Sequence, residues 1–376
     1  MKVIAPVVLV ALIFIIMAGC ENNPAEPEGI TVSGETRAKI GQMIMVGFRG
    51  IELADTNSII EDITERNIGG VILYEYDVPS HSRPRNIESP IQLQQLCADL
   101  QALDSTALLI AIDQEGGYVD RLKESYGFPP TVTAQHLGDV DNPDTTHYWA
   151  ASCAATLTDM GIDLNLAPVV DLNVNPECPV IGAYERSFSA DPEIVTSNAS
   201  IWIENHHTLG ILCAIKHFPG HGSSTTDSHL GMVDITETWS ETELEPFENI
   251  IDAGICDIVM TAHVFERNID PNYPATLSSA FIDGLLRGEL GFGGVVISDD
   301  MQGAIVDEFG ISTAIEKSIN AGVDILIFSN NSSEYDPEIA HEAIEIIVGL
   351  IESGTITVER IEESYDRIMV LKRLFT

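Results

Sequence analysis

Residues 108–113 read LLIAID, five apolar residues followed by a carboxylate. A short run that is apolar throughout, without polar residues at alternate positions, is typical of a strand buried on both faces of a parallel sheet. Seven more runs have a similar character, at residues 42–48, 70–74, 163–171, 212–217, 257–263, 294–299 and 324–329. The sequence therefore predicts eight buried strands.

Segments with apolar residues at helical spacing separate or follow these runs, at residues 90–103, 145–160, 192–209, 242–253, 311–321, 337–350 and 358–375. Eight strand and helix units in about 340 residues predict a closed barrel. An open doubly wound sheet is the alternative, but residues 47–50 (GFRG), after the first run, lack the glycine spacing of a phosphate-binding turn. We expect an α/β fold in a single domain, a (β/α)8 TIM-type barrel over residues 37–376.

The N-terminus has the composition of an export signal. Lys2 precedes an almost unbroken apolar run over residues 3–17, which is followed by Ala18-Gly19-Cys20. The end of this run resembles the bacterial lipoprotein signal, in which cleavage before the cysteine leaves a lipidated Cys20. An uncleaved anchor helix is the alternative. We expect a signal peptide at residues 1–19 and a protein anchored by lipid at the bacterial cell envelope, either periplasmic or at the cell surface.

The next segment reads ENNPAEPEGITVSGET over residues 21–36 and contains Pro, Glu and Gly without apolar periodicity. This composition is typical of a flexible linker, so we expect residues 20–36 to form a lipidated tether. No later segment has the roughly 18 consecutive apolar residues of a spanning helix, which leaves the lipid as the only expected contact with the membrane.

The charge excludes one class of partner. Asp and Glu number 58 against 18 Lys and Arg, which gives a net charge of −40. Binding to the phosphates of DNA or RNA needs clustered cations, so we expect no nucleic-acid partner.

The cysteines after Cys20 do not form a metal or disulfide pattern. They are odd in number and none belongs to a CxxC pair, at Cys97, Cys153, Cys178, Cys213 and Cys256. We expect them to be core residues, with a single disulfide as the alternative.

Polar residues end most of the predicted strands. They are Asp113, Asp171 with Asn173, Lys216 with His217, His263, Asp299 with Asp300, and Ser329 with Asn330. The active site of a (β/α)8 barrel lies at the carboxyl ends of its strands. Six polar strand ends around one rim therefore predict a catalytic site.

The densest group of reactive residues is KHFPGHGSSTTDSH, residues 216–229. Its Gly, Pro and Ser content indicates a functional loop. His217, His221, Asp227 and His229 could ligate a metal, or Asp227 and His229 could form a proton-carrying pair. We favour the pair, because a carboxylate one residue away can hold one imidazole tautomer, and because Lys216 would lie as a cation beside the metal.

Asp299 ends the apolar run at residues 294–299. A carboxylate at a barrel mouth suits a nucleophile at a sugar anomeric carbon, provided that a second group protonates the leaving oxygen. Position alone does not separate Asp299 from Asp300. We expect Asp300 to cap the helix that follows.

Six motifs, in order, resemble glycoside hydrolase family 3 and, within it, the β-N-acetylhexosaminidase branch. They are IAIDQEGGYVDRL (110–122), NLAPVVDLN (165–173), IGAYERSFSADP (181–192), KHFPGHGSSTTDSH (216–229), TAHVF with PATLS (261–278) and GFGGVVISDDM (291–301). The resemblance spans about residues 38–374. It implies a single-domain retaining enzyme that removes terminal N-acetylglucosamine from glycans and uses no metal and no cofactor.

The resemblance also implies roles for individual residues. Asp299 is the implied nucleophile, and His229, oriented by Asp227, is the implied acid and base. The implied ligands of the sugar in the −1 subsite are Asp113, Arg121, Arg186, Lys216 and His217. We expect a carbohydrate substrate and a monomeric enzyme.

Two features depart from the family pattern. Tyr184 and Glu185 stand before Arg186, where relatives often have a shorter turn, so the position of Arg186 depends on how this longer turn folds. Many members add a second α/β domain; here we expect the loops of the barrel to complete the site.

Several alternatives stay open. Within the family these are an N-acetylglucosaminide phosphorylase, because a histidine repels phosphate less than a carboxylate does, and a β-glucosidase. Outside it, the alternative is a sugar-binding lipoprotein without catalysis. The sequence does not choose among a muropeptide, a chitin oligosaccharide and another glycan as the source of the sugar.

Overall fold

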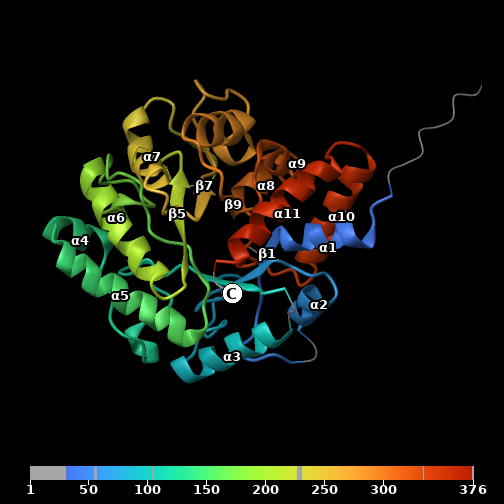
Figure 1. The fold of residues 1–376 in the computed structure, drawn as a ribbon, viewed down its shortest axis with the longest axis horizontal. Helices are drawn as coiled ribbons and strands as arrows, with labels where there is room; N and C mark the ends of the chain where they lie inside the picture. Colours follow the sequence, from blue (N-terminus) through green and yellow to red (C-terminus); the bar gives the residue numbers. More distant parts are fainter. Residues whose placement is uncertain (1–30, 55–56, 104–105, 227–230, 333, 375–376) are drawn as a thin grey trace, which may run out of the picture.

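The structure is a computed structural model that describes residues 31–54, 57–103, 106–226, 231–332 and 334–374. Eight parallel strands close into a barrel in the order β1-β10-β9-β7-β5-β4-β3-β2 (Figure 1). The strands are β1 (Ile44–Gly47), β2 (Gly70–Leu73), β3 (Leu109–Ile112), β4 (Leu164–Asn165), β5 (Leu212–Phe218), β7 (Ile258–Thr261), β9 (Val295–Asp300) and β10 (Ile325–Phe328). Each overlaps one of the eight predicted runs. The predicted (β/α)8 barrel is confirmed.

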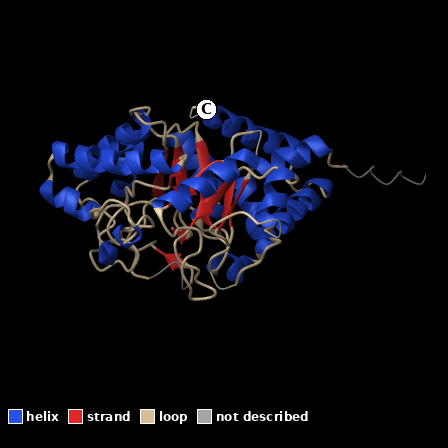
Figure 2. Cartoon of the chain, turned by 90° about the horizontal axis from the view of Figure 1, so that it is seen from below, coloured by secondary structure: helices blue, strands red, loops and turns tan. Residues whose placement is uncertain are grey.

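Helices surround the strands, and most loops gather at one end of the barrel (Figure 2). All seven predicted helical segments contain a helix. These are α3 (Pro90–Leu103), α5 (Pro143–Met160), α6 (Pro192–His207), α7 (Glu245–Asp252), α9 (Ile311–Ala321), α10 (Ile339–Glu352) and α11 (Val358–Lys372).

Further helices were not predicted. Four are α-helices: α1 (Gly34–Gln42), α2 (Ser58–Thr64), α4 (Ala134–Val140) and α8 (Ala304–Phe309). A longer one, η5 (Ala280–Glu289), is a π-helix in the connection from β7 to β9. Gly284 and Gly288 lower the helix propensity of η5, which hides it from a sequence reading. The first described helix, α1, begins at Gly34, three residues before residue 37, at which the barrel domain was predicted to begin.

The ends of α5 and α6 follow directly from their sequences. Asn142 accepts hydrogen bonds from the backbone of the first turn of α5, and Asp191 does the same for α6. A proline follows each cap, where its missing N–H costs no helical hydrogen bond. At the other end of α5, Gly161 adopts a φ of 74°, a left-handed conformation that suits glycine and stops the helix.

The barrel interior and the layer between strands and helices are apolar. The residues of β1, β2, β3 and β7 are all buried, as a parallel sheet covered on both faces requires. Cys97, Cys153, Cys178 and Cys213 belong to this buried set and Cys256 is half-buried; all five are free thiols. Burial raises the pKa of Cys97 to about 12, so that group stays a neutral thiol.

A second, two-stranded sheet lies outside the barrel. β6 (Val233–Asp234) pairs in parallel with β8 (Val264–Phe265), which joins the connection after β5 to the connection after β7. This sheet was not predicted. Among the residues that the structure describes, no helix is long and apolar enough to cross a membrane. The predicted signal peptide and its Cys20 lie outside the described residues.

Candidate active site

A cavity of about 280 Å3 opens at the carboxyl ends of the barrel strands. Seven strands contribute to its wall, either directly or through the residue that follows them. From the barrel these are Ile72, Tyr74, Asp113, Leu166, Lys216, His217, Met260, Asp299, Asp300 and Ile327, and the loops add Glu115, Arg121, Tyr184 and Arg186 among others. The cavity therefore brings together six of the residues predicted from the sequence: Asp113, Arg121, Arg186, Lys216, His217 and Asp299.

Lys216 is the central cation of this cavity. It lies near the end of β5, its side chain is 2% exposed, and its Nζ lies 2.7 Å from both Asp113 Oδ1 and Glu115 Oε1. Burial alone would raise the pKa of both carboxyl groups, but the charge of Lys216 and of the nearby arginines outweighs it and holds both pKa values below their usual range. Both acids are therefore ionised at neutral pH. An ammonium group has three N–H donors, so two carboxylates leave one donor for a substrate hydroxyl.

Arg186 forms a bidentate ion pair with Glu115. Its Nε and Nη2 both lie 2.8 Å from the carboxylate oxygens, its Nη1 donates to Val180 O, and its Nη2 also lies 3.2 Å from His217 Nε2. These contacts use four of the five N–H donors of the guanidinium. Arg186 thus reaches the cavity, and it joins the loop after β4 to the loop after β3 while one donor is left for a ligand.

Asp171 fixes both ends of the segment 217–221. Its Oδ1 accepts hydrogen bonds from the backbone N–H of His217 and His221, and its Oδ2 lies 2.6 Å from His217 Nδ1. The carboxylate is fully buried, and these donors, with His217 foremost, overcome burial and keep its pKa below the usual value. With Nδ1 donating to Asp171, Nε2 of His217 is the nitrogen that accepts from Arg186.

Arg121 is held between two carboxylates. Its guanidinium lies 3.4 Å from Asp113 Oδ2 and 3.7 Å from Glu75 Oε2, and it stacks over the ring of Tyr74 at 5.4 Å. Glu75 is itself nearly buried and also binds Lys123 at 2.9 Å. These contacts hold the Arg121 side chain beside Asp113, where it can donate to the same ligand.

The structure gives Asp299 and Asp300 different surroundings. Asp300 accepts from the backbone N–H and the Oγ of Ser329, which ties the end of β9 to the end of β10. The prediction that Asp300 caps the next helix is wrong: α8 begins after Gly303 and has no side-chain cap. Glycine at that position supplies no acceptor, and the strand runs on through Asp300. Asp299 Oδ1 accepts from the Asp300 backbone N–H at 2.7 Å, and its carboxylate lines the cavity.

The loop after β5 is described as far as residue 226. His221 is buried, its Nδ1 lies 2.7 Å from Ser224 Oγ, and burial followed by the neighbouring His217 lowers its pKa to about 4. His221 is therefore neutral at pH 7. Asp227 and His229, the predicted proton-carrying pair, lie outside the described residues. Among the residues that the structure does describe, no group of three or more His, Cys, Asp or Glu side chains is arranged to hold a metal ion.

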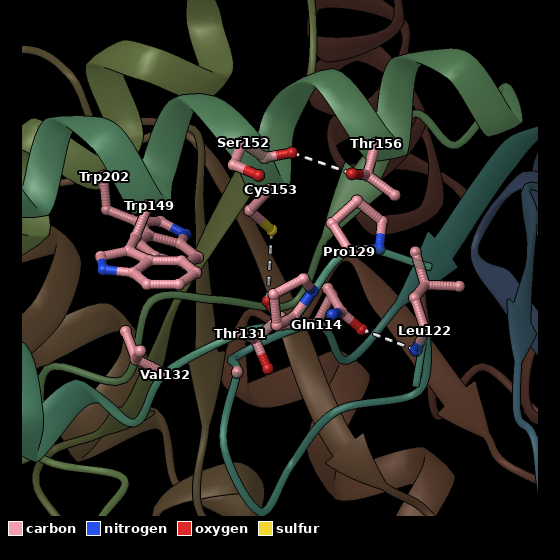
Figure 3. Close-up of a pocket in the computed structure, with 12 residues that line it drawn as sticks. Gln114, Leu122, Pro129, Thr131, Val132, Trp149, Ser152, Cys153, Thr156 and Trp202 are labelled. Atoms are coloured by element: carbon pink, nitrogen blue, oxygen red, sulfur yellow. Dashed lines mark hydrogen bonds between the residues drawn. The ribbon is translucent and has the colours of Figure 1, made fainter. Parts of the chain in front are cut away.

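A second, much smaller cavity of about 20 Å3 lies behind the loop after β3, against α5 (Figure 3). Gln114 lines this smaller cavity. Its Oε1 accepts from the backbone N–H of Arg121 and Leu122, and its Nε2 donates to Asp120 at 2.6 Å. Because Gln114 is 3% exposed and bonded at both ends of its amide, it holds the loop that carries Arg121 in one conformation.

Four residues of this site had no role assigned from the sequence: Glu75, Gln114, Glu115 and Asp171. Glu115 and Gln114 belong to the quoted segment DQEGG directly after β3, and Asp171 was recognised only as a polar strand end. Their importance depends on pairing with residues far along the chain, such as Glu115 with Arg186, and no local pattern signals that pairing.

Comparison with known proteins agrees with this geometry. The glycosyl hydrolase family 3 N terminal domain matches residues 35–371. The chain belongs to glycosyl hydrolase family 3. The resemblance drawn from the six motifs is therefore confirmed.

Individual family 3 relatives cover most of the chain. A β-hexosaminidase of Tolumonas auensis is 37% identical over 294 residues, which are 77% of this chain and 83% of that protein. A family 3 β-N-acetylglucosaminidase from Paenibacillus sp. str. FPU-7 superposes with a TM-score of 0.81 at 35% identity, over 90% of this chain but 62% of its own. A β-N-acetylhexosaminidase from Beutenbergia cavernae superposes with a TM-score of 0.77 at 30% identity, over 91% of this chain and 99% of its own.

Proposed function

We propose that this family 3 protein is a retaining, exo-acting β-N-acetylglucosaminidase that removes terminal N-acetylglucosamine from glycans. The observation that carries the proposal is the placement of Asp299 in one small cavity with Asp113, Lys216 and Arg186, a mixture of acceptors and donors suited to sugar hydroxyls. At about 280 Å3 the cavity is at the lower end of small-molecule sites. It suits a single sugar ring, as removal of one terminal residue at a time requires.

The proposed reaction has two displacements. In the first, Asp299 attacks the anomeric carbon while His229, oriented by Asp227, protonates the leaving oxygen, which gives a glycosyl ester on Asp299 and a free aglycone. In the second, His229 takes a proton from water, the oxygen of that water attacks the anomeric carbon, and the ester bond to Asp299 breaks. The sugar leaves with its original anomeric configuration.

The described residues have distinct tasks in this scheme. Asp113 accepts hydrogen bonds from sugar hydroxyls, while Lys216 and Arg121 each donate from a side chain already fixed by a carboxylate. Holding these donors in place before the substrate arrives lowers the entropy cost of reaching the transition state. Asp171 keeps His217 in one tautomer at the same wall.

The activity is tested with an aryl N-acetyl-β-glucosaminide and the matching aryl β-glucoside, each with and without phosphate. We expect faster release from the N-acetyl substrate and free N-acetylglucosamine as the product in both buffers. Equal rates on the two substrates would instead indicate a β-glucosidase, and a sugar 1-phosphate product would indicate a phosphorylase. If neither substrate is cleaved, a sugar-binding protein without catalysis becomes the better explanation.

The role of His229 predicts a dependence on the leaving group. We expect His229→Ala to slow hydrolysis of a substrate with an alkyl or sugar leaving group far more than hydrolysis of an activated aryl substrate, because a good leaving group needs little protonation. The measurement is kcat/KM for both substrates in both proteins. Equal losses on the two substrates would show that His229 holds the sugar and does not supply the proton.

We also propose that the enzyme is exported and anchored by lipid on Cys20. The support is the sequence of residues 1–20, an apolar run behind Lys2 that ends in Cys20. Substitution Cys20→Ser removes the acylation site, so we expect the protein to leave the membrane fraction and keep its specific activity. A Cys20→Ser protein that sediments with membranes as the parent does would disprove the lipid anchor.

A further inference from the structure

Two exposed tyrosines stand at the mouth of the cavity. Tyr118 is 63% exposed and Tyr184 is 50% exposed, yet both line the same cavity as Asp299 and Lys216. Their rings meet edge to face, with centroids 6.0 Å apart and planes at 78°. Large aromatic side chains carry apolar surface that folding normally buries, so a pair of them left exposed at the entrance of a site indicates a binding surface.

The two tyrosines come from different loops that are joined just beneath them. Tyr118 lies three residues after Glu115, in the loop after β3, and Tyr184 lies two residues before Arg186, in the loop after β4. The bidentate Glu115 and Arg186 ion pair therefore connects the bases of both loops. It holds the two loops together beneath the rings.

Each ring is also held by its own tight turn. Gly116 and Gly117 have φ values of 98° and 62°, and Glu115 and Gly116 both donate to the Val119 carbonyl, so the turn closes around Tyr118. A Cβ on Gly116 would lie 2.4 Å from Val132 O, which excludes other residues there. Tyr184 ends the short 3₁₀ turn η2 (Gly182–Tyr184), in which a Cβ on Gly182 would lie 2.5 Å from Pro176 O. Rings presented this way lose little entropy when a ligand stacks on them.

The position of the two tyrosines indicates which part of a bound ligand they contact. The donors and acceptors for the terminal sugar, Asp113, Lys216 and Arg186, are buried or half-buried in the wall, whereas Tyr118 and Tyr184 lie at its outer end. A ligand that fills the inner cavity and continues outward must pass the two rings. In a glycan, the part that continues outward is the sugar that carries the leaving oxygen.

We propose that Tyr118 and Tyr184 form the binding platform for this second sugar, so that the enzyme prefers a β-linked disaccharide or longer oligosaccharide over a glycoside with a small aglycone. The face of a pyranose ring that carries axial C–H groups is apolar and stacks on aromatic rings. This inference rests on the proposed hydrolase activity and adds the chemical class of the leaving group to it.

The test compares two substrates that both have an unactivated alcohol as leaving group. N-acetylglucosaminyl-β-1,4-N-acetylglucosamine has a second ring, and methyl N-acetyl-β-glucosaminide has none. We expect Tyr118→Ala and Tyr184→Ala each to lower kcat/KM on the disaccharide by about three- to tenfold, mainly through KM, because a lost stacking contact removes uniform binding. Hydrolysis of the methyl glycoside should stay within about twofold of the parent, since neither ring contacts its aglycone.

Two kinds of control separate stacking from other effects. Tyr118→Phe and Tyr184→Phe keep the ring and should retain the disaccharide preference. Tyr148→Ala removes another exposed tyrosine, which lies on α5, is 65% exposed and is in edge contact with Trp149. This substitution should change kcat/KM on neither substrate. Equal losses on both substrates, or Phe variants as poor as Ala variants, would overturn the platform. If the parent protein cleaves neither substrate, the hydrolase proposal itself fails, which is a different result.

Discussion

The substitution Asp299→Ala is expected to lower kcat on an activated aryl N-acetyl-β-glucosaminide by roughly a thousandfold or more, because the variant lacks the carboxylate proposed to form the glycosyl ester. The fold should survive. Asp299 is half-exposed at the end of β9 and accepts a hydrogen bond from the adjacent Asp300 backbone, outside the apolar core. Near-normal melting together with lost turnover would therefore assign the loss to chemistry. A variant that keeps more than about a tenth of the parent rate would remove Asp299 from the role of nucleophile.

A small anion gives this experiment a second readout. In the Asp299→Ala protein, azide can enter the space of the lost carboxylate and attack the anomeric carbon of the aryl substrate. The aryl oxide then leaves, and the product is a glycosyl azide of the opposite configuration. Asp300→Ala is the matched control: the carboxylate of Asp300 binds Ser329, so we expect a smaller loss of turnover and no glycosyl azide. If the Asp300 variant formed a glycosyl azide, Asp300 would be assigned as the nucleophile in place of Asp299.

The barrel was predictable because its strands carry an unusual signal. Residues 109–112 (LIAI) and 258–260 (IVM) are apolar at every position, and only a strand covered on both faces needs that. Helices gave a weaker signal where glycine interrupted them, as in η5 with Gly284 and Gly288, or where they were short, as in α2. Their formation depends on packing against the barrel, which a local pattern does not record.

The residues of the site that lie at the ends of strands could be predicted from the sequence. Asp113, Lys216, His217 and Asp299 each end or follow a buried run, and the closed barrel brings such ends together. What those residues bind was not predictable. The Lys216 contact with Glu115 and the Arg186 contact with Glu115 cross 101 and 71 positions of the sequence, and only the closed barrel and its loops create them. The same holds for Asp171, whose fully buried carboxylate organises the segment 217–221.

Lys216 is the residue whose removal should destabilise the protein most among those of the site. We expect Lys216→Met to lower the free energy of unfolding at pH 7 by about 3 kcal/mol, because a buried carboxylate pair loses its shared cation. This value is at the lower end for a broken buried pair, since Arg121 still lies near Asp113 and Arg186 still binds Glu115. Lys317→Met is the control. Its ion pair with Glu316 is 2.8 Å long but lies at the surface, so that change should stay within about 0.5 kcal/mol.

The charge of Lys216 also predicts how the difference in stability between the parent and the Lys216→Met protein changes with pH. In the parent protein the lowered pKa values of Asp113 and Glu115 stabilise the fold above their unfolded values near 4, and this stabilisation is lost as the pH falls through the folded values. Without Lys216, only Arg121 offsets burial at Asp113, so the pKa of Asp113 is higher than in the parent and its ionised form stabilises the fold less at neutral pH. Urea unfolding of both proteins between pH 3 and 8 should therefore show a difference in stability that is largest near pH 7 and narrows as the pH falls, above all below pH 4, where the parent approaches the folded pKa values of its two carboxyl groups. A difference that stays constant over this range would mean that Lys216 stabilises the barrel through the packing of its alkyl chain and not through its charge.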